Sequence, residues 1–336
     1  MIKKSTECLD VPDDAYMDGA MAVYAAKQLK QLKGSDKPFF MAVGFKKPHL
    51  PFVAPKQYWD MYDRSKVSLA AWQKPSIDGP EVAYHNAGEL RSYTDIKPLD
   101  DKKGGGQLLK IADDQQRELI HGYYACISYI DAQIGMLMKA LKDAGLDKNT
   151  IVVLWGDHGW HLGDHSLWCK HSNFEQAAKA PLLFSVPGIT KGNVYTQSSE
   201  FVDVFPTLCE LAGIKVPEYL DGKSLVPALK DNNVAIKPFA ISQYPRGEKG
   251  VAKSIMGYSL RDAQYRFTEW VGNEFTTAKK FDPSSVKALE LYDLVKDPLE
   301  TRNIANDPAM KQVVKKLSEQ LHAYYAQQYA TAGIVN

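Results

Sequence analysis

The sequence predicts an α/β protein in which a mostly parallel sheet is flanked by helices, followed by a smaller antiparallel β subdomain and a terminal helix. A long helical pattern at residues 113–144 separates two apolar runs, 38–45 and 151–155, that are typical of buried strands. A helix between successive strands is the usual connection in a parallel sheet. Short β-rich runs later in the chain indicate the antiparallel part. We therefore assign residues 1–228 to the α/β portion and 229–336 to the smaller α+β subdomain.

Two helices are expected in the α/β portion. Residues 13–33 repeat apolar side chains at near-helical spacing, with Asp13 or Asp14 as the N-cap and Gly34 at the end. Residues 113–144 are predicted to pack on the sheet through one apolar stripe, and Gly145 ends the helix. The stripe consists of Leu119, Tyr123, Ile127, Ile130, Ile134, Leu137 and Leu141.

The apolar runs are assigned as strands. Residues 151–155 are β-branched and do not alternate, which is typical of a parallel strand buried on both faces. Residues 38–45 are predicted to form a second buried strand, followed by a loop in which Pro48 and Pro51 brace His49. Further elements are a strand at 181–186, a helix at 201–212, antiparallel strands around 239–244, 254–261, 265–271 and 289–294, and a helix at 308–329.

Residues 52–114 carry weak signals, with scattered proline, glycine and aromatic residues and the glycine-rich run Lys102–Gly106. Long irregular connections in compact domains are often functional. We expect this stretch to cover the site.

The composition excludes several classes of function. Lysine and arginine total 41 against 40 for aspartate and glutamate, so no overall field favours nucleic acid or a membrane surface. No apolar segment reaches the roughly 18 to 20 residues that span a bilayer, and the start has no apolar stretch typical of a signal peptide. The four cysteines are far apart, and we expect no disulfide framework.

Polar residues gather directly after the strand at 151–155. They are Asp157, His158, His161, Asp164, His165, Lys170 and His171. In open α/β sheets the ligand crevice lies beyond the carboxyl ends of the strands, where this cluster falls. Asp157 and His158 offer one oxygen and one nitrogen ligand, and their spacing alone does not decide between calcium and zinc. Lys170 and His49 are donors available for a tetrahedral oxyanion, whereas His161, His165 and His171 are interpreted as supporting or structural.

Several segments carry a family resemblance in matching order, among them PFFMAVGFKKPHLPF, GDHGWHLGDHSLWCKHSNF and ELYDLVKDPLETRNIA. The chain resembles type I, formylglycine-dependent sulfatases of the alkaline-phosphatase superfamily, in the iduronate-2-sulfatase-like branch. The resemblance covers nearly the whole chain. It implies an alkaline-phosphatase-like fold and hydrolysis of sulfate esters, with a sulfated sugar or polysaccharide as substrate.

The resemblance also implies roles for particular residues. Asp157 and His158 match metal ligands, normally for calcium. His49 and Lys170 match the catalytic histidine and lysine that hold the sulfate, and Trp160 matches a position that lines the substrate pocket. Family members are usually periplasmic, extracellular or, in animals, lysosomal, and we expect the same of this protein.

Two departures from the pattern of the family bear on activity. The formylglycine motif C/S-x-P-x-R is not found, since Cys8 lies in CLDVP and Ser242 lies in SQYPR. The early Asp-Asp pair on the metal is also lacking, and Asp13–Asp14 begins a helix instead of following a strand. We interpret the chain as starting partway into the fold, so that the calcium site needs further Asp ligands and formylglycine is not encoded here. Formylglycine hydrate is the nucleophile, so the chain alone is predicted to be inactive.

Three hypotheses follow for function. The first is a sulfatase of which this chain is the carboxyl-terminal portion. The second is an inactive fragment or pseudoenzyme that keeps an anion pocket or associates with the missing amino-terminal portion supplied as another chain. The third is a phosphatase or phosphodiesterase of the same superfamily.

Overall fold

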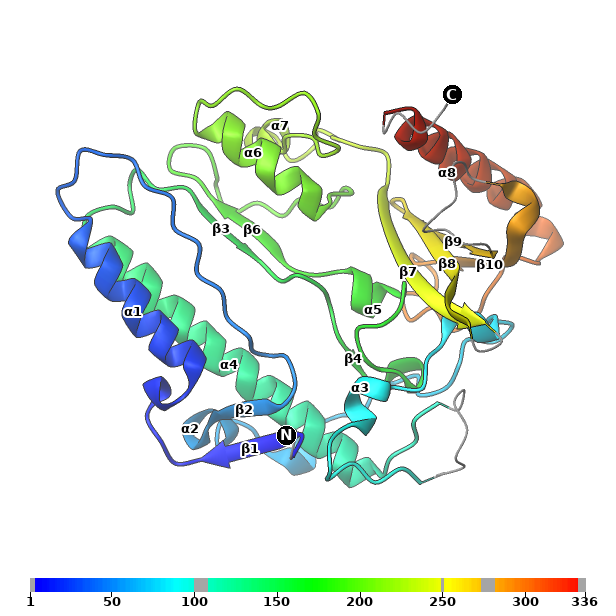
Figure 1. The fold of residues 1–336 in the computed structure, drawn as a ribbon, viewed down its shortest axis with the longest axis horizontal. Helices are drawn as coiled ribbons and strands as arrows, with labels where there is room; N and C mark the ends of the chain where they lie inside the picture. Colours follow the sequence, from blue (N-terminus) through cyan, green and yellow to red (C-terminus); the bar gives the residue numbers. More distant parts are fainter. Residues whose placement is uncertain (1–3, 100–107, 249–250, 273–281, 332–336) are drawn as a thin grey trace.

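The structure is a computed structural model that describes residues 4–99, 108–248, 251–272 and 282–331. The run Lys102–Gly106 lies outside these residues. The described residues include a two-stranded ribbon and a four-stranded sheet. Figure 1 shows the ribbon between two long helices on one side and the four-stranded sheet with the terminal helix on the other. The helices are α1 (Met17–Gln31), α2 (Lys56–Trp59), α3 (Gly88–Arg91), α4 (Asp113–Asp143), α5 (Glu175–Ala178), α6 (Val204–Leu211), α7 (Val226–Lys230) and α8 (Lys311–Thr331). The strands are β1 (Thr6–Leu9), β2 (Phe52–Pro55), β3 (Val152–Trp155), β4 (His161–Leu162), β5 (Trp168–Cys169), β6 (Leu182–Ser185), β7 (Ala240–Glu248), β8 (Val251–Arg261), β9 (Tyr265–Gly272) and β10 (Val286–Asp293).

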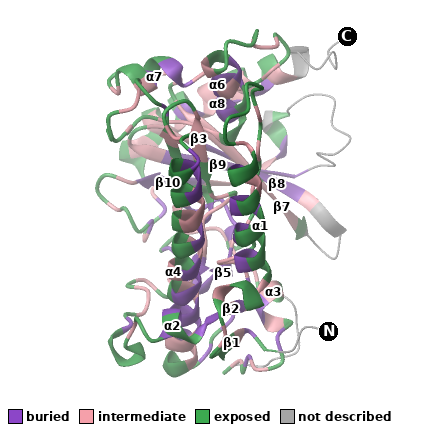
Figure 2. Ribbon diagram, turned by 90° about the vertical axis from the view of Figure 1, so that its left-hand side faces the viewer, coloured by how far each residue is buried: buried purple, intermediate pink, exposed green. Residues whose placement is uncertain are grey.

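The two predicted helices of the α/β portion are confirmed as α1 and α4. The predicted cap at Asp13 or Asp14 is wrong, because Asp13–Ala15 forms a separate 3-10 turn and Tyr16 is the N-cap of α1. Ala26 and Leu29 of α1 pack in one buried cluster with Ala140 and Leu141 of α4, and Figure 2 shows buried positions alternating with exposed ones along α4. The predicted stripe is only partly buried, because Ile127 is 43% exposed. Packing against α1 and β2, instead of against a broad sheet, leaves part of that stripe in solvent.

The expectation of one parallel sheet is met only in part. β1 and β2 do pair in parallel, with Thr6 opposite Phe52. β3 is a strand as predicted, but it pairs with β6 in antiparallel register, with Val152 opposite Ser185, and this sheet has two strands. The prediction that residues 151–155 are buried on both faces is wrong, since Trp155 is 49% exposed. A strand is buried on both faces only when further layers cover it.

The predicted strand at residues 38–45 is not formed. The segment carries no strand assignment, and Phe40 is 85% exposed. Figure 1 draws it as an extended trace between α1 and β2. A strand needs a hydrogen-bonded neighbour, and no described residue pairs with this run. Apolar composition predicted the extended backbone but not the missing neighbour.

The stretch 52–114 is less irregular than expected. It contains β2, α2 and α3, and its Trp59 and Leu90 are at most 4% exposed. Trp59 packs its ring against His121 of α4, with the ring centroids 4.9 Å apart. The stretch therefore forms part of the hydrophobic core beneath the polar cluster and also borders that cluster.

The predicted C-terminal antiparallel sheet and terminal helix are confirmed. The strands lie in the order β10-β9-β8-β7, all antiparallel. Leu260 and Phe267 are fully buried and pack with Leu321 of α8 in a second core. The division between residues 228 and 229 stays a prediction. None of the described helices is long and apolar enough to cross a bilayer.

Candidate functional site

The loop after β3 presents Asp157 and His158. The Asp157 side chain is 85% exposed, and its Oδ2 lies 3.6 Å from Nε2 of His158. His158 Nδ1 is 2.7 Å from the carbonyl oxygen of Gly159. A carbonyl only accepts, so Nδ1 carries the proton and the neutral ring keeps its Nε2 lone pair for a ligand. Asp157 and His158 thus place an oxygen and a nitrogen donor side by side.

Gly159 fixes the path of this loop. Its backbone N–H donates to the carbonyl of Ala177 in α5 at 2.8 Å. A Cβ at Gly159 would lie 2.0 Å from the carbonyl oxygen of Gln176, which no side chain tolerates. The close backbone approach explains the glycine in the DHGW segment and holds its neighbours against α5.

His49 lies on the loop before β2, between the two prolines that the sequence analysis singled out. Its Nδ1 donates to the carbonyl of Leu50 at 2.7 Å, so in the neutral ring Nε2 is an acceptor. Burial lowers the pKa of His49, and the nearby Lys170 lowers it further against the opposing bond to Leu50. The Lys47 ammonium stabilises the loop by donating to the carbonyls of His49 and Pro51.

Lys170 follows β5, and its side chain contacts His49. The Lys170 Nζ donates to His49 Nε2 at 2.8 Å. β5 pairs with β4, so the two ends of this short hairpin bring Lys170 close to Trp160. The ammonium lies 5.0 Å from the Trp160 ring centroid, within the range of a cation–π interaction. Residues far apart in sequence therefore converge on one ammonium group.

Glu89 is a member of the cluster that the sequence analysis missed. Lys170 Nζ lies 2.9 Å from both carboxylate oxygens of Glu89, and His49 Nε2 lies 3.2 Å from Oε1. His171 Nε2 donates to Glu89 Oε2 at 2.9 Å. Burial disfavours the carboxylate charge, but the hydrogen bonds from His171 and Lys170 outweigh it and lower the pKa of Glu89 to about 2. Glu89 is thus ionised beside the predicted anion-binding pair.

Trp160 forms a wall of the cluster. Its ring stacks on His158 with the centroids 5.8 Å apart and meets the His49 ring edge-on at 5.5 Å. Trp160 therefore lies between the possible metal ligands Asp157 and His158 on one side and the Lys170–His49 pair on the other. Its buried Nε1 has no hydrogen-bond partner among the described residues.

The other histidines of the segment support it. The fully buried His161 is held between Asp164, through Nδ1, and Ser172, through Nε2 at 2.7 Å. His165 stacks on Phe174 with the ring centroids 4.3 Å apart, and burial lowers its pKa to about 4. In the described part of the chain, neither the His161 ring nor the His165 ring contacts Lys170 or His49.

The C-terminal sheet braces the cluster from behind. Tyr244 of β7 hydrogen-bonds His171 Nδ1 at 2.7 Å. Arg246 donates to the carbonyl of His171 at 2.6 Å and to that of Ala83 at 3.1 Å. The composition of the segment SQYPRG gave no signal that Tyr244 and Arg246 reach the site.

The described residues do not fit a complete calcium site. Calcium takes roughly six to eight oxygen ligands, and Asp157 supplies the one carboxylate beside His158. Among residues 4–99, 108–248, 251–272 and 282–331, no group of three or more His, Cys, Asp or Glu side chains is placed to hold a metal ion. We derive no reaction step through a metal.

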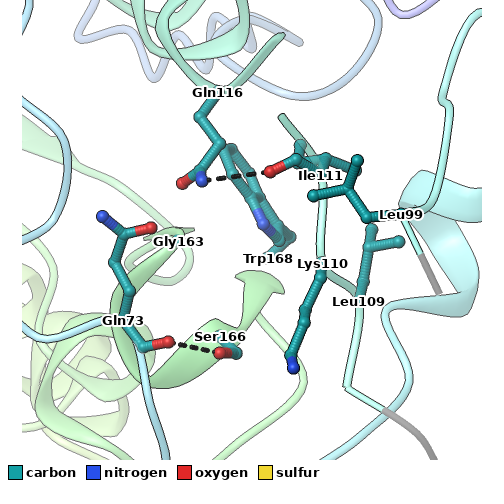
Figure 3. A pocket seen from close by; sticks show the side chains of 9 residues that line it. All are labelled: Gln73, Leu99, Leu109, Lys110, Ile111, Gln116, Gly163, Ser166 and Trp168. Carbon is teal, nitrogen blue, oxygen red and sulfur yellow. Dashed lines mark hydrogen bonds between the residues drawn. The ribbon is translucent and has the colours of Figure 1, made fainter. Parts of the chain in front are cut away.

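A pocket opens on another side of β5. Trp168 forms one wall, and the amide groups of Gln73 and Gln116 line it (Figure 3). Gln116 Nε2 donates to the carbonyl of Ile111, and Ser166 Oγ donates to that of Gln73. The predicted site residues do not line this pocket, so we place the candidate site at the Lys170 cluster.

Comparison with known proteins assigns the family. Residues 2–214 match the Sulfatase family, and residues 163–327 match the family described as N-sulphoglucosamine sulphohydrolase, C-terminal. This chain belongs to the sulfatase family. Iduronate 2-sulfatase from Homo sapiens is 33% identical over 90% of this chain and 64% of its own length. A sulfatase from Formosa agariphila is 31% identical over 85% of this chain and 50% of its own length.

Solved structures share the fold. A phosphonate monoester hydrolase from Silicibacter pomeroyi superposes with a TM-score of 0.74 at 24% identity, covering 94% of this chain and 61% of that chain. A 2-O GAG sulfatase superposes with a TM-score of 0.70 at 22% identity, covering 98% of this chain and 67% of that chain. The alkaline-phosphatase-like fold class is thereby confirmed. The chain spans less than two thirds of the length of the iduronate 2-sulfatases it matches.

Proposed function

We propose that this chain is the carboxyl-terminal portion of a sulfatase that hydrolyses sulfate esters of a sulfated sugar or polysaccharide. The observation that carries the proposal is the contact between Lys170 and His49, 2.8 Å apart and walled by Trp160. An ammonium and an imidazole at this distance can both contact one tetrahedral oxyanion. The named relatives, which include iduronate 2-sulfatase, support a sulfated sugar as the substrate class.

Each residue then has a role. Lys170 donates hydrogen bonds to the sulfate oxygens and stabilises their negative charge. His49, once protonated, donates to the ester oxygen that leaves with the sugar. Trp160 offers an apolar face on which a sugar ring can pack. Asp157 and His158 would supply two ligands to calcium, and further Asp ligands would have to come from outside this chain.

The nucleophile must also come from outside residues 1–336. These residues contain no C/S-x-P-x-R motif from which formylglycine is made. Without that nucleophile the cations can bind sulfate but cannot form the covalent intermediate. This observation favours one second candidate, an inactive fragment or pseudoenzyme that keeps the anion pocket.

The missing portion has a place to bind. Trp155 of β3 and Leu183 of β6 are 49% and 53% exposed, and Phe40 is 85% exposed. Exposed apolar side chains beside unpaired strand edges favour association with another polypeptide. We propose that the missing amino-terminal portion, in the same or another chain, covers this surface, and that residues 1–228 belong with it in one α/β domain while 229–336 form the smaller subdomain.

The experiment is a comparison of turnover of an aryl sulfate, with calcium, by this chain and by the complete protein including the upstream coding sequence. We expect turnover by the complete protein and none by the isolated chain. Lys170→Ala and His49→Ala in the complete protein should abolish turnover, while the exposed Tyr219→Phe should not. An upstream sequence without C/S-x-P-x-R, or faster turnover of an aryl phosphate, would overturn the sulfatase proposal.

By family resemblance we further propose an exported location, in the periplasm, the cell exterior or a lysosome. Cell fractionation with an antibody to the chain tests this proposal. Recovery in the cytosolic fraction alone would contradict it.

A further inference from the structure

Glu89 places a negative charge where the proposed function requires a negative ligand. Its Oε1 lies 2.9 Å from Lys170 Nζ and 3.2 Å from His49 Nε2, so the carboxylate faces both groups that would hold the ester. Because its pKa is lowered to about 2, this carboxylate remains ionised at any working pH. The positive charge of Lys170 is therefore already balanced before a ligand arrives.

We infer that Glu89 is a specificity-determining residue that makes the Lys170–His49 pair favour monoanionic esters over dianionic ones. A sulfate monoester carries one negative charge, whereas a phosphate monoester carries about two above its second pKa of roughly 6. The inference rests on the proposed function, because it assumes that the ester oxygens bind at Lys170 and His49. Beyond that function, the inference states which class of ester the Lys170–His49 pair favours and names Glu89 as the side chain that causes the preference.

The distances determine how large the effect is. A ligand oxygen within hydrogen-bond reach of both Lys170 and His49 lies roughly 4 to 5 Å from the Glu89 carboxylate. Repulsion of one additional charge at that distance, partly screened by water, weakens binding of a dianion about tenfold relative to a monoanion. The repulsion does not depend on whether the central atom is sulfur or phosphorus. Glu89 therefore discriminates between ligands by their charge, and not by whether the central atom is sulfur or phosphorus.

Glu89 is held firmly enough to exert this repulsion. It lies on α3, where the next residue, Leu90, is 1% exposed. His171 binds its second oxygen at 2.9 Å, and Tyr244 binds His171 in turn at 2.7 Å. A carboxylate fixed from two sides does not swing away when a ligand takes up hydrogen bonds to Lys170.

Three probe ligands distinguish the effect of the ligand's charge from the effect of its central atom. Phenyl sulfate and phenyl methylphosphonate each carry one negative charge, while phenyl phosphate carries two at about pH 8. Binding to the 336-residue chain is measured by calorimetry and by the NMR signals of His49, with EDTA present so that no divalent cation contributes. We expect the wild type to bind phenyl phosphate no more tightly than the two monoanions, and Lys170→Met to lose all three.

The variants test the charge directly. Glu89→Gln keeps the shape of the side chain and removes its charge, and it should raise affinity for phenyl phosphate about tenfold relative to both monoanions. Glu89→Asp, which keeps the charge, should retain the wild-type ratio. Glu218→Gln is the matched control, because the Glu218 side chain is 86% exposed and pairs with Lys215 on the surface.

Each contrary outcome overturns the inference. An equal gain for all three probes in Glu89→Gln would mean that Glu89 merely competes for Lys170. Tighter binding of phenyl phosphate than of phenyl methylphosphonate by the wild type would contradict the inference without any variant, even if Glu89→Gln failed to fold. Absence of binding by all three probes would also overturn it. The sulfatase proposal is judged separately, by turnover in the complete protein.

Discussion

The strands of the β3–β6 ribbon, VVLW and LLFS, are more apolar than those of the C-terminal sheet, such as YRFTEWVG and VKALELYD, yet they are less buried. In the C-terminal sheet, Leu260 and Phe267 are fully buried beneath α8. In the ribbon, Trp155 and Leu183 are about half exposed. Figure 2 shows this difference as purple positions in one region and pink or green in the other. The comparison teaches that an apolar strand gains stability from what covers it, and not from its own composition.

The C-terminal region also buries charge. Arg266 and Glu300 are at most 1% exposed and form an ion pair through Arg266 Nε and Glu300 Oε1. Glu300 Oε2 accepts from the backbone N–H of Glu175 in α5 at 2.9 Å. The Arg266 guanidinium also lies 4.8 Å from the Phe174 ring centroid. This pair therefore attaches the C-terminal sheet to the segment that carries the candidate site.

Breaking that pair should have the largest effect on stability. Arg266→Met leaves the Glu300 carboxylate buried without its cation, which typically costs about 3 to 5 kcal/mol. Urea unfolding followed by circular dichroism measures the loss. The matched control is Lys315→Met, because Lys315 and Glu319 form an exposed pair 3.9 Å apart. A loss below about 1 kcal/mol in Arg266→Met would show that the C-terminal region does not depend on its buried pair.

Acid should weaken the contacts of the Glu89 carboxylate with Lys170 and His171. The folded pKa of about 2 lies below the ordinary value of 4.5, so the ionised carboxylate stabilises the fold above pH 4.5 and this contribution is lost as pH falls toward 2. Because the Glu89 carboxylate is partly exposed, solvent screening reduces this contribution below the roughly 3 kcal/mol of the full shift. Unfolding measured at intervals across this range should show the loss in the wild type and in Glu218→Gln but not in Glu89→Gln. Parallel acid profiles in all three proteins would contradict this prediction.

Removing one hydroxyl should loosen the site from the C-terminal sheet more mildly. Tyr244→Phe deletes the 2.7 Å hydrogen bond to His171 Nδ1 and should cost about 1 kcal/mol. The ¹⁵N signal of His171 Nδ1 should move while that of His158 stays in place. Tyr219→Phe, at a position 80% exposed, serves as the control. An unchanged His171 signal would mean that β7 does not reach the site in solution.

The smallest effect on the isolated chain should come from the ribbon. Leu183→Ala should change the free energy of unfolding by less than about 0.5 kcal/mol, because the side chain is already 53% exposed. The same substitution at the buried Leu260 of β8 should cost about 2 to 5 kcal/mol. Equal losses at the two positions would contradict the comparison between the regions.

Local patterns in the sequence predicted the helices and the C-terminal strands well. Residues 113–144 were expected to be helical and α4 spans Asp113–Asp143, because the apolar period and the closing glycine are contained in the segment itself. The strand expected at residues 38–45 was not formed, because pairing depends on a neighbour elsewhere. The exposure of Trp155 has the same cause. Periodicity therefore predicts backbone conformation better than it predicts burial.

The site was predictable only where a motif marked it. The family resemblance predicts that Lys170 and His49 hold the same sulfate, and the structure places them 2.8 Å apart. Their separation of more than a hundred residues carried no signal by itself. Glu89 lies in a stretch with weak signals, and a single glutamate before Leu90 looks like any surface carboxylate. Its role depends on three side chains that converge on it in space.

Gly159 makes the loop sensitive to distant events. Its backbone is clamped against Gln176 and Ala177 in α5, and α5 leads within a few residues into the exposed strand β6. A displacement of β6 would therefore be transmitted along the chain to the position of Trp160 and His158. Were the missing portion proposed above to bind along the ribbon, a movement of β6 would also change the positions of Trp160 and His158. Binding of that portion and alignment of the candidate site would then occur in a single conformational change.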